Sequence, residues 1–347
     1  MDNTTLPLRF RIHRIGVVSG LLIGALVLAI CLSLVLGPVK IPLNDLFAAL
    51  SGEADRATQT ILYNIRAPRT VLALAVGASL AVSGACLQGM LRNPLADPSL
   101  IGITAGASTA VVAAIVLGDN FIAGLNPQFR AFVLPIAAFS GAFATTLIVL
   151  HAAYKYGQFS VARLILVGVA MGAIAMAMTG VLIYFSTDQQ LRELTFWTMG
   201  SLAKSNWISV IASGSIILVS TALLLRFART LDLFQLGERA AFHAGVEVNR
   251  TKMGICLLVS IAVGAGVAVA GPIGFIGLVA PHIVRLLVGS VHKYVLPIAA
   301  IAGAALMLIA DIAVRITIPP QELPIGLATA LLGGPFFFWL LLRVRHL

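Results

Sequence analysis

Long stretches without a charged residue divide this 347-residue chain, and they restrict its fold more than any other feature. A helix needs about 20 residues to cross a hydrocarbon core of roughly 30 Å, and each stretch is long enough. A soluble domain does not bury so many such segments. We therefore expect an all-α, polytopic membrane protein. The stretches are residues 15–39, 70–91, 98–118, 131–150, 164–187, 205–225 and 323–342.

Two more spans are expected in the uncharged residues 253–284, which are too long for one crossing. Gly271 and Pro272 interrupt this region. Proline removes a backbone donor and clashes with the preceding turn. We therefore expect one span near 253–270 and another near 273–290.

A further span is expected over Tyr294–Ala310, extending to Arg315. Residues 188–204 carry charges around an aromatic pair, so we expect a short interfacial helix there. The prediction is then ten transmembrane helices in a single domain, residues 1–347.

The basic residues indicate how these spans are oriented. Ten spans place both termini on one side, and most of the 23 Lys and Arg residues fall in the loops and termini of that side. The richer side is expected to be cytoplasmic. The net charge of +10 is thereby explained without nucleic acid, since the chain has no run of Lys and Arg.

Groups that could supply energy or chemistry are sparse. The sequence places Asp97 at a span boundary and Asp311 near the end of the ninth span, so no acid is expected deep in the membrane. Ion-coupled transporters generally need such groups. No Lys follows a Gly, which excludes a Walker A loop. We expect no catalytic residue, no metal site and an external energy source. An ion-coupled secondary transporter, which also uses interrupted helices, remains the alternative.

Small residues recur at helix-face spacing in several spans, for example Gly77, Ala81 and Gly84. Such stripes are typical of close helix packing in membranes. Met171 and Met178 share a face of the fifth span. They could line a pathway for a large apolar ligand, although core or lipid contact is the more common role.

The longest loop on the predicted cytoplasmic side is 226–252. It contains a short helix candidate in which Gly237 stands at the start, Glu238 suits the positive N-terminal end, and Gly245 suits a left-handed cap. This helix could rest on lipid headgroups, but its small apolar face favours a protein groove. Its residues are Leu236, Gly237, Glu238, Arg239, Ala240, Ala241, Phe242, His243, Ala244 and Gly245.

Four motifs carry a resemblance to a known family. They are Ile65–Arg69 (IRAPR), Arg92–Pro98 (RNPLADP), Gly274–Arg285 (GFIGLVAPHIVR) and Glu322–Gly326 (ELPIG). In this order and spacing they resemble the FecCD-like permease subunits of type II ABC importers for haem, ferric siderophores and cobalamin. The resemblance implies a ten-span permease of the bacterial inner membrane, working as a homodimer or pseudo-dimer. It also implies a cytoplasmic ABC ATPase dimer, which would bind the ATP and Mg, and a periplasmic binding protein.

The resemblance also assigns roles to residues. Loop 226–252 would be the coupling element that enters the ATPase. Arg66, Arg69 and Arg315 would meet acidic residues of the binding protein. For the cargo, family likeness favours haem slightly, then a ferric siderophore, then cobalamin.

A cytoplasmic gate is implied at Asn93 and Leu95 and at the loop before the fifth span. The gate positions in that loop are Val161 and Ala162, which are apolar where some relatives carry hydroxyls. We therefore expect a hydrophobic plug rather than a hydrogen-bonded gate. The pathway lining would come mainly from the fifth and tenth spans, with Met171 and Met178 as candidates.

Overall fold

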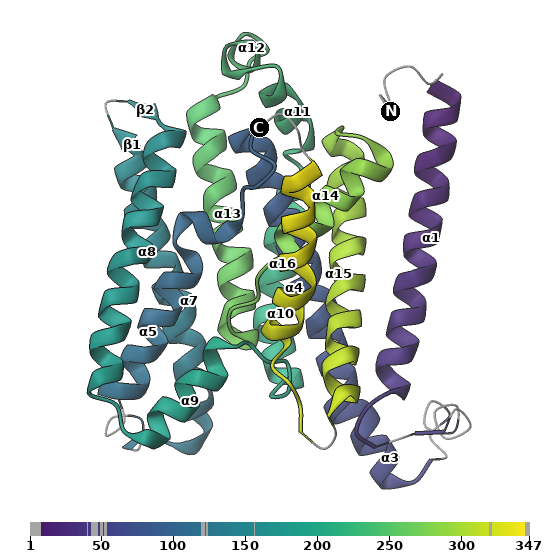
Figure 1. Ribbon diagram of the computed structural model, residues 1–347, viewed down its shortest axis with the longest axis vertical. Helices are drawn as coiled ribbons and strands as arrows, with labels where there is room; N and C mark the ends of the chain where they lie inside the picture. The colour runs from purple at the N-terminus through teal and green to yellow at the C-terminus, as the bar shows by residue number, and fades with distance from the viewer. Residues whose placement is uncertain are drawn as a thin grey trace.

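A computed structural model describes residues 8–343 except 40, 43–47, 49–50, 52–53, 119–121, 123, 156 and 319–320. It is a bundle of helices that run roughly parallel to one axis (Figure 1). In the described part, seven helices are long and apolar enough to cross a membrane. They belong to α1 (Leu8–Val35), α4 (Ala67–Leu91), α7 (Pro127–Ala153), α8 (Val161–Tyr184), α10 (Trp207–Leu225), α13 (Val248–Ala270) and α15 (His292–Thr317).

Three further apolar helices are α5 (Ile103–Leu117), α14 (Ile276–Val288) and α16 (Ile325–Arg343). Together with the seven long helices they correspond one for one to the predicted spans. The all-α, polytopic fold is confirmed. The number of ten crossings stays a prediction, because α5 and α14, with 15 and 13 residues, fall below the length that a full crossing requires.

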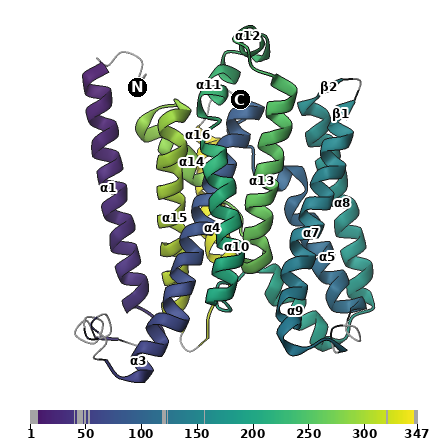
Figure 2. The ribbon, with the colours of Figure 1, turned by 180° about the vertical axis from the view of Figure 1, so that it is seen from behind.

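The small elements lie at the two ends of the bundle (Figures 1 and 2). One end, called here the α9 end, carries α9 (Asp188–Thr198), α3 (Arg56–Thr60) and the π-helical turn η2 (Ile61–Arg66). The opposite end, the α12 end, carries the remaining small elements, and α1 begins and α16 ends there. These elements are α11 (Ala228–Gln235), α12 (Glu238–His243) and the two-stranded hairpin β1 (Tyr154–Lys155) and β2 (Gln158–Phe159).

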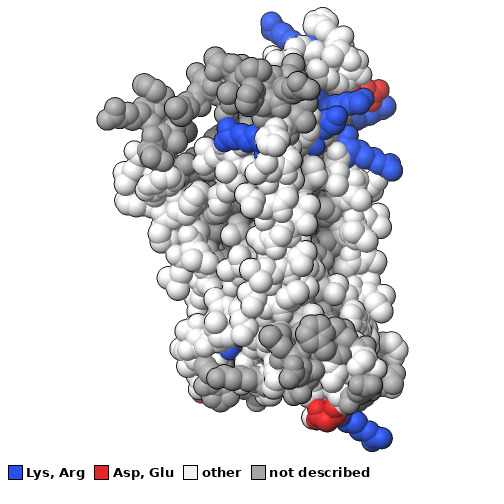
Figure 3. All heavy atoms as spheres, turned by 90° about the vertical axis from the view of Figure 1, so that its right-hand side faces the viewer, with Lys and Arg blue, Asp and Glu red and all other residues white. Residues whose placement is uncertain are grey.

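Charged side chains avoid the middle of the one face of the molecule that Figure 3 shows. On the face shown in Figure 3, a broad uncharged band separates Lys and Arg side chains gathered at the α12 end from a few charges at the α9 end. Large apolar side chains are exposed along the outer helices, and α1 and α8 stand at opposite edges of the bundle (Figure 2). This distribution suits a bundle surrounded by lipid.

Helix α4 lies at the centre of the bundle and packs against α15, α14, α10 and α13. Its small residues allow close approach, as their spacing predicted. Gly77 lies against the backbone of Gly303 in α15, and Gly84 lies against the carbonyl of Gly277 in α14. A Cβ atom at either position would overlap backbone atoms that cannot rotate away.

The third predicted span begins later than expected. Residues 98–101 form the 3-10 turn η3 (Pro98–Ile101), and α5 starts only at Ile103. Asp97 caps this turn by accepting a hydrogen bond from the backbone N–H of Ser99 at 2.9 Å. Gly102 then adopts a left-handed conformation with φ of 76°. The prediction of a continuous span from residue 98 is wrong, because a turn without charges is invisible in a charge pattern.

The break at Gly271 is confirmed, since α13 ends at Ala270 and Gly271 has φ of 68°. The predicted start of that helix is corrected from 253 to Val248. The charge pattern excluded Lys252 from the helix. The structure buries this lysine and pairs its Nζ with Glu238 at 2.7 Å.

The glycine contacts of α4 give a first testable prediction. Gly84→Ala should lower the free energy of unfolding by about 1–3 kcal/mol, because the new methyl group overlaps the Gly277 backbone. The measurement is reversible unfolding of the purified protein in mixed micelles. Gly20→Ala on α1 is the matched control, since nothing lies within 4 Å of its Cβ position. Equal stability of the Gly84 variant and the wild type would contradict this account of the packing.

Candidate coupling, gate and docking sites

The loop between α10 and α13 contains two helices rather than one. Helix α12 covers Glu238–His243, inside the predicted helical segment, and α11 precedes it as an unpredicted second helix. Gly237 stands at the start of α12 with φ of 108°, and Gly245 follows its end with φ of 85°. The predicted roles of both glycines are confirmed. The predicted loop is shorter than 226–252, because residues 248–252 belong to α13.

The two loop helices are fixed to the bundle by apolar contacts. Leu231 and Phe234 of α11 are completely or almost completely buried, and Ala241 of α12 is also buried. These contacts make α11 and α12 part of the folded bundle rather than a flexible tether.

A hydrogen-bonded contact and an ion pair strengthen this attachment. Asp232 of α11 accepts a hydrogen bond from the backbone N–H of His292 and contacts its Nδ1, both at 2.8 Å. Glu238 of α12 pairs with buried Lys252 of α13. A displacement of α11 or α12 would therefore be transmitted directly to α15 and α13.

The outer surface of the same segment is apolar and exposed. Leu236 is 74% exposed and Phe242 is 67% exposed, and α12 projects beyond the rest of the bundle (Figure 1). Arg239, Ala240 and His243 are exposed beside them. Large apolar groups exposed on a projecting segment are typical of a surface that contacts another protein or a membrane.

The residues assigned to a gate lie in two separate segments. Asn93 accepts a hydrogen bond from the N–H of Leu95 at 2.9 Å, which stabilises the turn after α4. Val161 and Ala162 are the first two residues of α8. The side chain of Ser160 caps that helix by accepting a hydrogen bond from the backbone N–H of Arg163. Among the described residues no hydrogen bond joins the two segments, and the gate assignment stays a prediction.

Gln88 is a polar centre that the sequence reasoning did not identify. This side chain of α4 is 3% exposed. Its Nε2 donates to the carbonyls of Ala96 and Gly277, each at 3.3 Å, and its Oε1 accepts from Arg285. Gln88 thus ties α4 to the segment after it and to α14. The only signal in the sequence was one polar residue in a stripe of small ones.

The two candidate pathway methionines differ in their surroundings. Met171 is partly buried beside Gly102, whereas Met178 is 53% exposed on the outer side of α8. A cavity of about 510 Å³ lies elsewhere, with Asp97, Thr104 and Phe275 in its wall. Its described lining includes neither methionine, so their role in a pathway stays a prediction.

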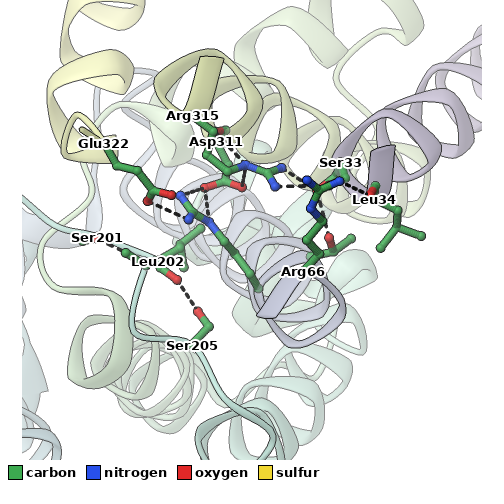
Figure 4. A network of polar contacts seen from close by, with 12 residues as sticks. Ser33, Leu34, Arg66, Ser201, Leu202, Ser205, Asp311, Arg315 and Glu322 are labelled. Carbon is green, nitrogen blue, oxygen red and sulfur yellow. Dashed lines mark hydrogen bonds and ion pairs between the residues drawn. The ribbon is translucent and has the colours of Figure 1, made fainter. Parts of the chain in front are cut away.

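An ion cluster lies inside the bundle at the α9 end (Figure 4). Asp311 is completely buried, and one of its carboxylate oxygens pairs with Arg69 at 2.8 Å while the other pairs with Arg315 at 3.1 Å. Arg69 also reaches Glu322 at 2.7 Å. The expectation of an interior without buried acids is therefore wrong. The carboxylate is tolerated because two guanidinium groups compensate its charge.

Arg66 lies next to this cluster and stabilises the end of α1. Its guanidinium donates to the carbonyls of Leu34, Val35 and Val39. Arg66, Arg69 and Arg315 are each at most 5% exposed. The structure therefore brings the three arginines together as predicted, but with partners within this chain. Contact with a binding protein stays a prediction.

Comparisons with known proteins agree with these features. Residues 25–343 match the FecCD transport family. The chain belongs to the FecCD transport family. It is 46% identical over 286 residues to the hemin transport system permease protein HmuU of Yersinia pestis, covering 82% of this chain and 84% of the relative. It is 39% identical to the Fe(3+) dicitrate transport system permease protein FecD of Escherichia coli, covering 90% and 94%.

A solved structure supports the same assignment for this FecCD chain. A metal-chelate type ABC transporter in an inward-facing conformation matches with a TM-score of 0.82 at 31% identity. The match covers 95% of this chain and 99% of the other. The chain is thus a multi-pass membrane permease with the fold of a type II ABC importer.

The buried ion cluster of this FecCD permease gives a second prediction. Asp311→Asn should lower the free energy of unfolding by about 3–5 kcal/mol, because two buried guanidinium groups lose their shared counter-charge. The measurement is chemical unfolding in micelles.

Glu322→Gln is the control for the Asp311 variant. Its side chain is 27% exposed and water can replace part of its interaction with Arg69, so a loss of roughly 1 kcal/mol or less is expected. If the two variants were equally stable, the cluster would not depend on Asp311.

Proposed function

We propose that this chain is the permease subunit of an ATP-driven importer that moves an iron-containing chelate into the cytoplasm by alternating access. The observation that carries the proposal is the apolar tip of α12, braced against the bundle by Glu238–Lys252 and Asp232–His292. Such a tip suits insertion into a groove of a separate ATPase. The α12 end would then face the cytoplasm, with both termini on that side.

The source of energy follows from what the described residues provide. They contain no cluster of three or more His, Cys, Asp or Glu side chains that could hold a metal ion, and the chain has no Walker A loop. The buried carboxylate of Asp311 is occupied by two arginines. An ion-coupled transporter needs a carboxylate that can exchange its proton or ion. These points favour an external ATPase over the ion-coupled alternative.

The mechanism follows from the rigid attachment of the coupling helices. ATP binding would close the two ATPase subunits and move α12 and α11 with them. Their polar contacts with α13 and α15 would carry this movement into the bundle, and the segments at Asn93–Leu95 and Val161–Ala162 would open or close. The permease itself would contribute no covalent chemistry, and its cavity would bind cargo weakly enough for release.

Two partners complete the proposed assembly. A second permease copy would pack beside this one, with α8 and α16 lining a pathway between them. A periplasmic binding protein would dock at the α9 end. Arg66, Arg69 and Arg315 would contribute to that docking only by exchanging their partners within the chain, or indirectly by holding the docking surface in place.

The cargo is proposed from the relatives. HmuU, which is 46% identical over 286 residues, is named a hemin transport permease, so haem is the first candidate. A ferric siderophore is second, because FecD is named for Fe(3+) dicitrate. Cobalamin is third, since related permeases are named for vitamin B12 import.

The proposal is tested by uptake in reconstituted vesicles that contain the permease, its ATPase and its binding protein. ATP-dependent accumulation of haem is the expected result, with a ferric siderophore and cobalamin as the compared cargoes. Uptake driven by a proton or sodium gradient without ATPase would overturn the proposal.

Phe242 provides a third prediction about the ATPase contact. Phe242→Ala should weaken co-purification of the ATPase and reduce ATP-driven uptake at least roughly tenfold, because a buried aromatic anchor commonly contributes about 2 kcal/mol or more to an interface. Phe196→Ala is the matched control for ATPase co-purification, because Phe196 is similarly exposed at 61% but lies on α9 at the other end. Normal ATPase assembly in the Phe242 variant would exclude this residue as an anchor.

A further inference from the structure

A second cavity, of about 300 Å³, opens at the α12 end. Its walls come from the last turn of α4 and the segment after it, the end of α14, and α11. It therefore lies where the coupling loop meets the segment assigned to the gate. Arg92, Gln235 and Arg285 place polar side chains on its lining.

The charge of Arg285 has no acidic counterpart. Its guanidinium donates to two neutral acceptors, Oε1 of Gln88 and the carbonyl of Ala85 at 3.4 Å. Among the described residues, no Asp or Glu forms an ion pair with Arg285 or Arg92. The C-terminal end of α14 compensates only part of this charge. By contrast, the buried cations Arg69 and Lys252 each have a carboxylate partner. Arg66 also lacks one, but three backbone carbonyls accept from its guanidinium, and it lines no part of this cavity.

The position of Arg285 is fixed by Gln88. Because the Nε2 of Gln88 donates to Ala96 and Gly277, its Oε1 must face Arg285. The guanidinium is thus held at the cavity wall with donors left over, since an arginine carries five N–H groups. A solvated surface arginine is not held in one position in this way. A guanidinium that is fixed and lacks a counter-charge is expected of a binding site.

Arg92 and Gln235 add further donors to the same cavity. Arg92 caps the end of α4 in a left-handed conformation with φ of 51°. Its side chain forms no hydrogen bond or ion pair with the described residues. Gln235 is held by weak contacts of its Nε2 with the carbonyl of Ser290 and Nδ1 of His292, both at 3.4 Å. With Gln88, the cavity thus combines two guanidinium groups and two amides.

We propose that this cavity binds a phosphate-type oxyanion. The planar fork of arginine matches phosphate oxygens in pairs, and two such forks meet here without a competing carboxylate. The phosphate group could come from free phosphate in solution or from the headgroup of an anionic lipid in the adjacent leaflet. Anion binding itself does not rest on the proposed transport function. If that function holds, the bound anion would tie α11 of the coupling loop to the turn at Asn93–Leu95.

The test uses the full-length purified protein with two sources of phosphate. Binding of inorganic phosphate is measured by calorimetry in detergent, and binding of phosphatidylglycerol by native mass spectrometry from phosphatidylcholine nanodiscs with and without that lipid. Arg92→Asn removes one guanidinium at an exposed position and keeps a residue that tolerates the left-handed conformation. Arg285→Gln removes the other.

We expect each variant to weaken phosphate or phosphatidylglycerol binding roughly tenfold, the loss typical of one charge-assisted contact. Arg229→Gln is the control, because Arg229 is exposed on α11 and outside the cavity lining. Binding of inorganic phosphate would identify a soluble anion, and binding of the lipid alone would identify a headgroup.

Two outcomes would overturn the proposal. One is no binding of either probe to the wild type, or binding that both variants leave unchanged. The other is that Arg92→Asn impairs ATPase assembly while neither probe binds, which would make the cavity a receptor for an acidic side chain of the partner.

Discussion

The close approach of α4 to its neighbours is the contact on which the rest of the bundle depends. In lipid there is little hydrophobic drive to bring helices together, so packing must come from backbone surfaces that fit. Gly77 and Gly84 supply this fit against α15 and α14. Because α4 is central, these two contacts hold α15 and α14 in place within the bundle.

Helix α4 also connects two polar centres that differ in character. At the α9 end, Arg69 joins a cluster in which every charge has a partner within the chain. At the α12 end, Gln88 positions Arg285, whose charge is not compensated. A fully paired cluster suits a fixed anchor, and an uncompensated one suits a place where something binds. Helix α4 therefore has a fully paired ion cluster near one end and an arginine without a counter-charge near the other.

Much of the fold could be predicted from the sequence because lipid excludes charge, and uncharged stretches therefore mark helices. The break at Gly271 and the caps at Gly237 and Gly245 were also visible, since proline and glycine act locally. Tertiary pairing was not visible. Lys252 seemed to lie outside its helix and Asp311 near the end of another, yet both side chains are buried because a distant residue compensates each charge.

Of the candidate sites, the helix Glu238–His243 was the most predictable, since a glycine flanks it at each end. The arginines were correctly grouped, but their burial depends on Asp311 and on carbonyls of α1, which no local pattern reveals. Gln88 escaped notice for the same reason. The cargo was not predictable, because no described side chain has chemistry specific to iron, a porphyrin or a corrin.

The proposed transport requires the α12 end to face the cytoplasm, where an ATPase can bind it. Single cysteines test this directly in a background with Cys31 replaced, because Cys31 is exposed. Leu236→Cys should react with a membrane-impermeant maleimide in inside-out vesicles and not in intact spheroplasts. Lys204→Cys, exposed near the α9 end, should show the reverse. Labelling of position 236 from outside the cell would contradict the account.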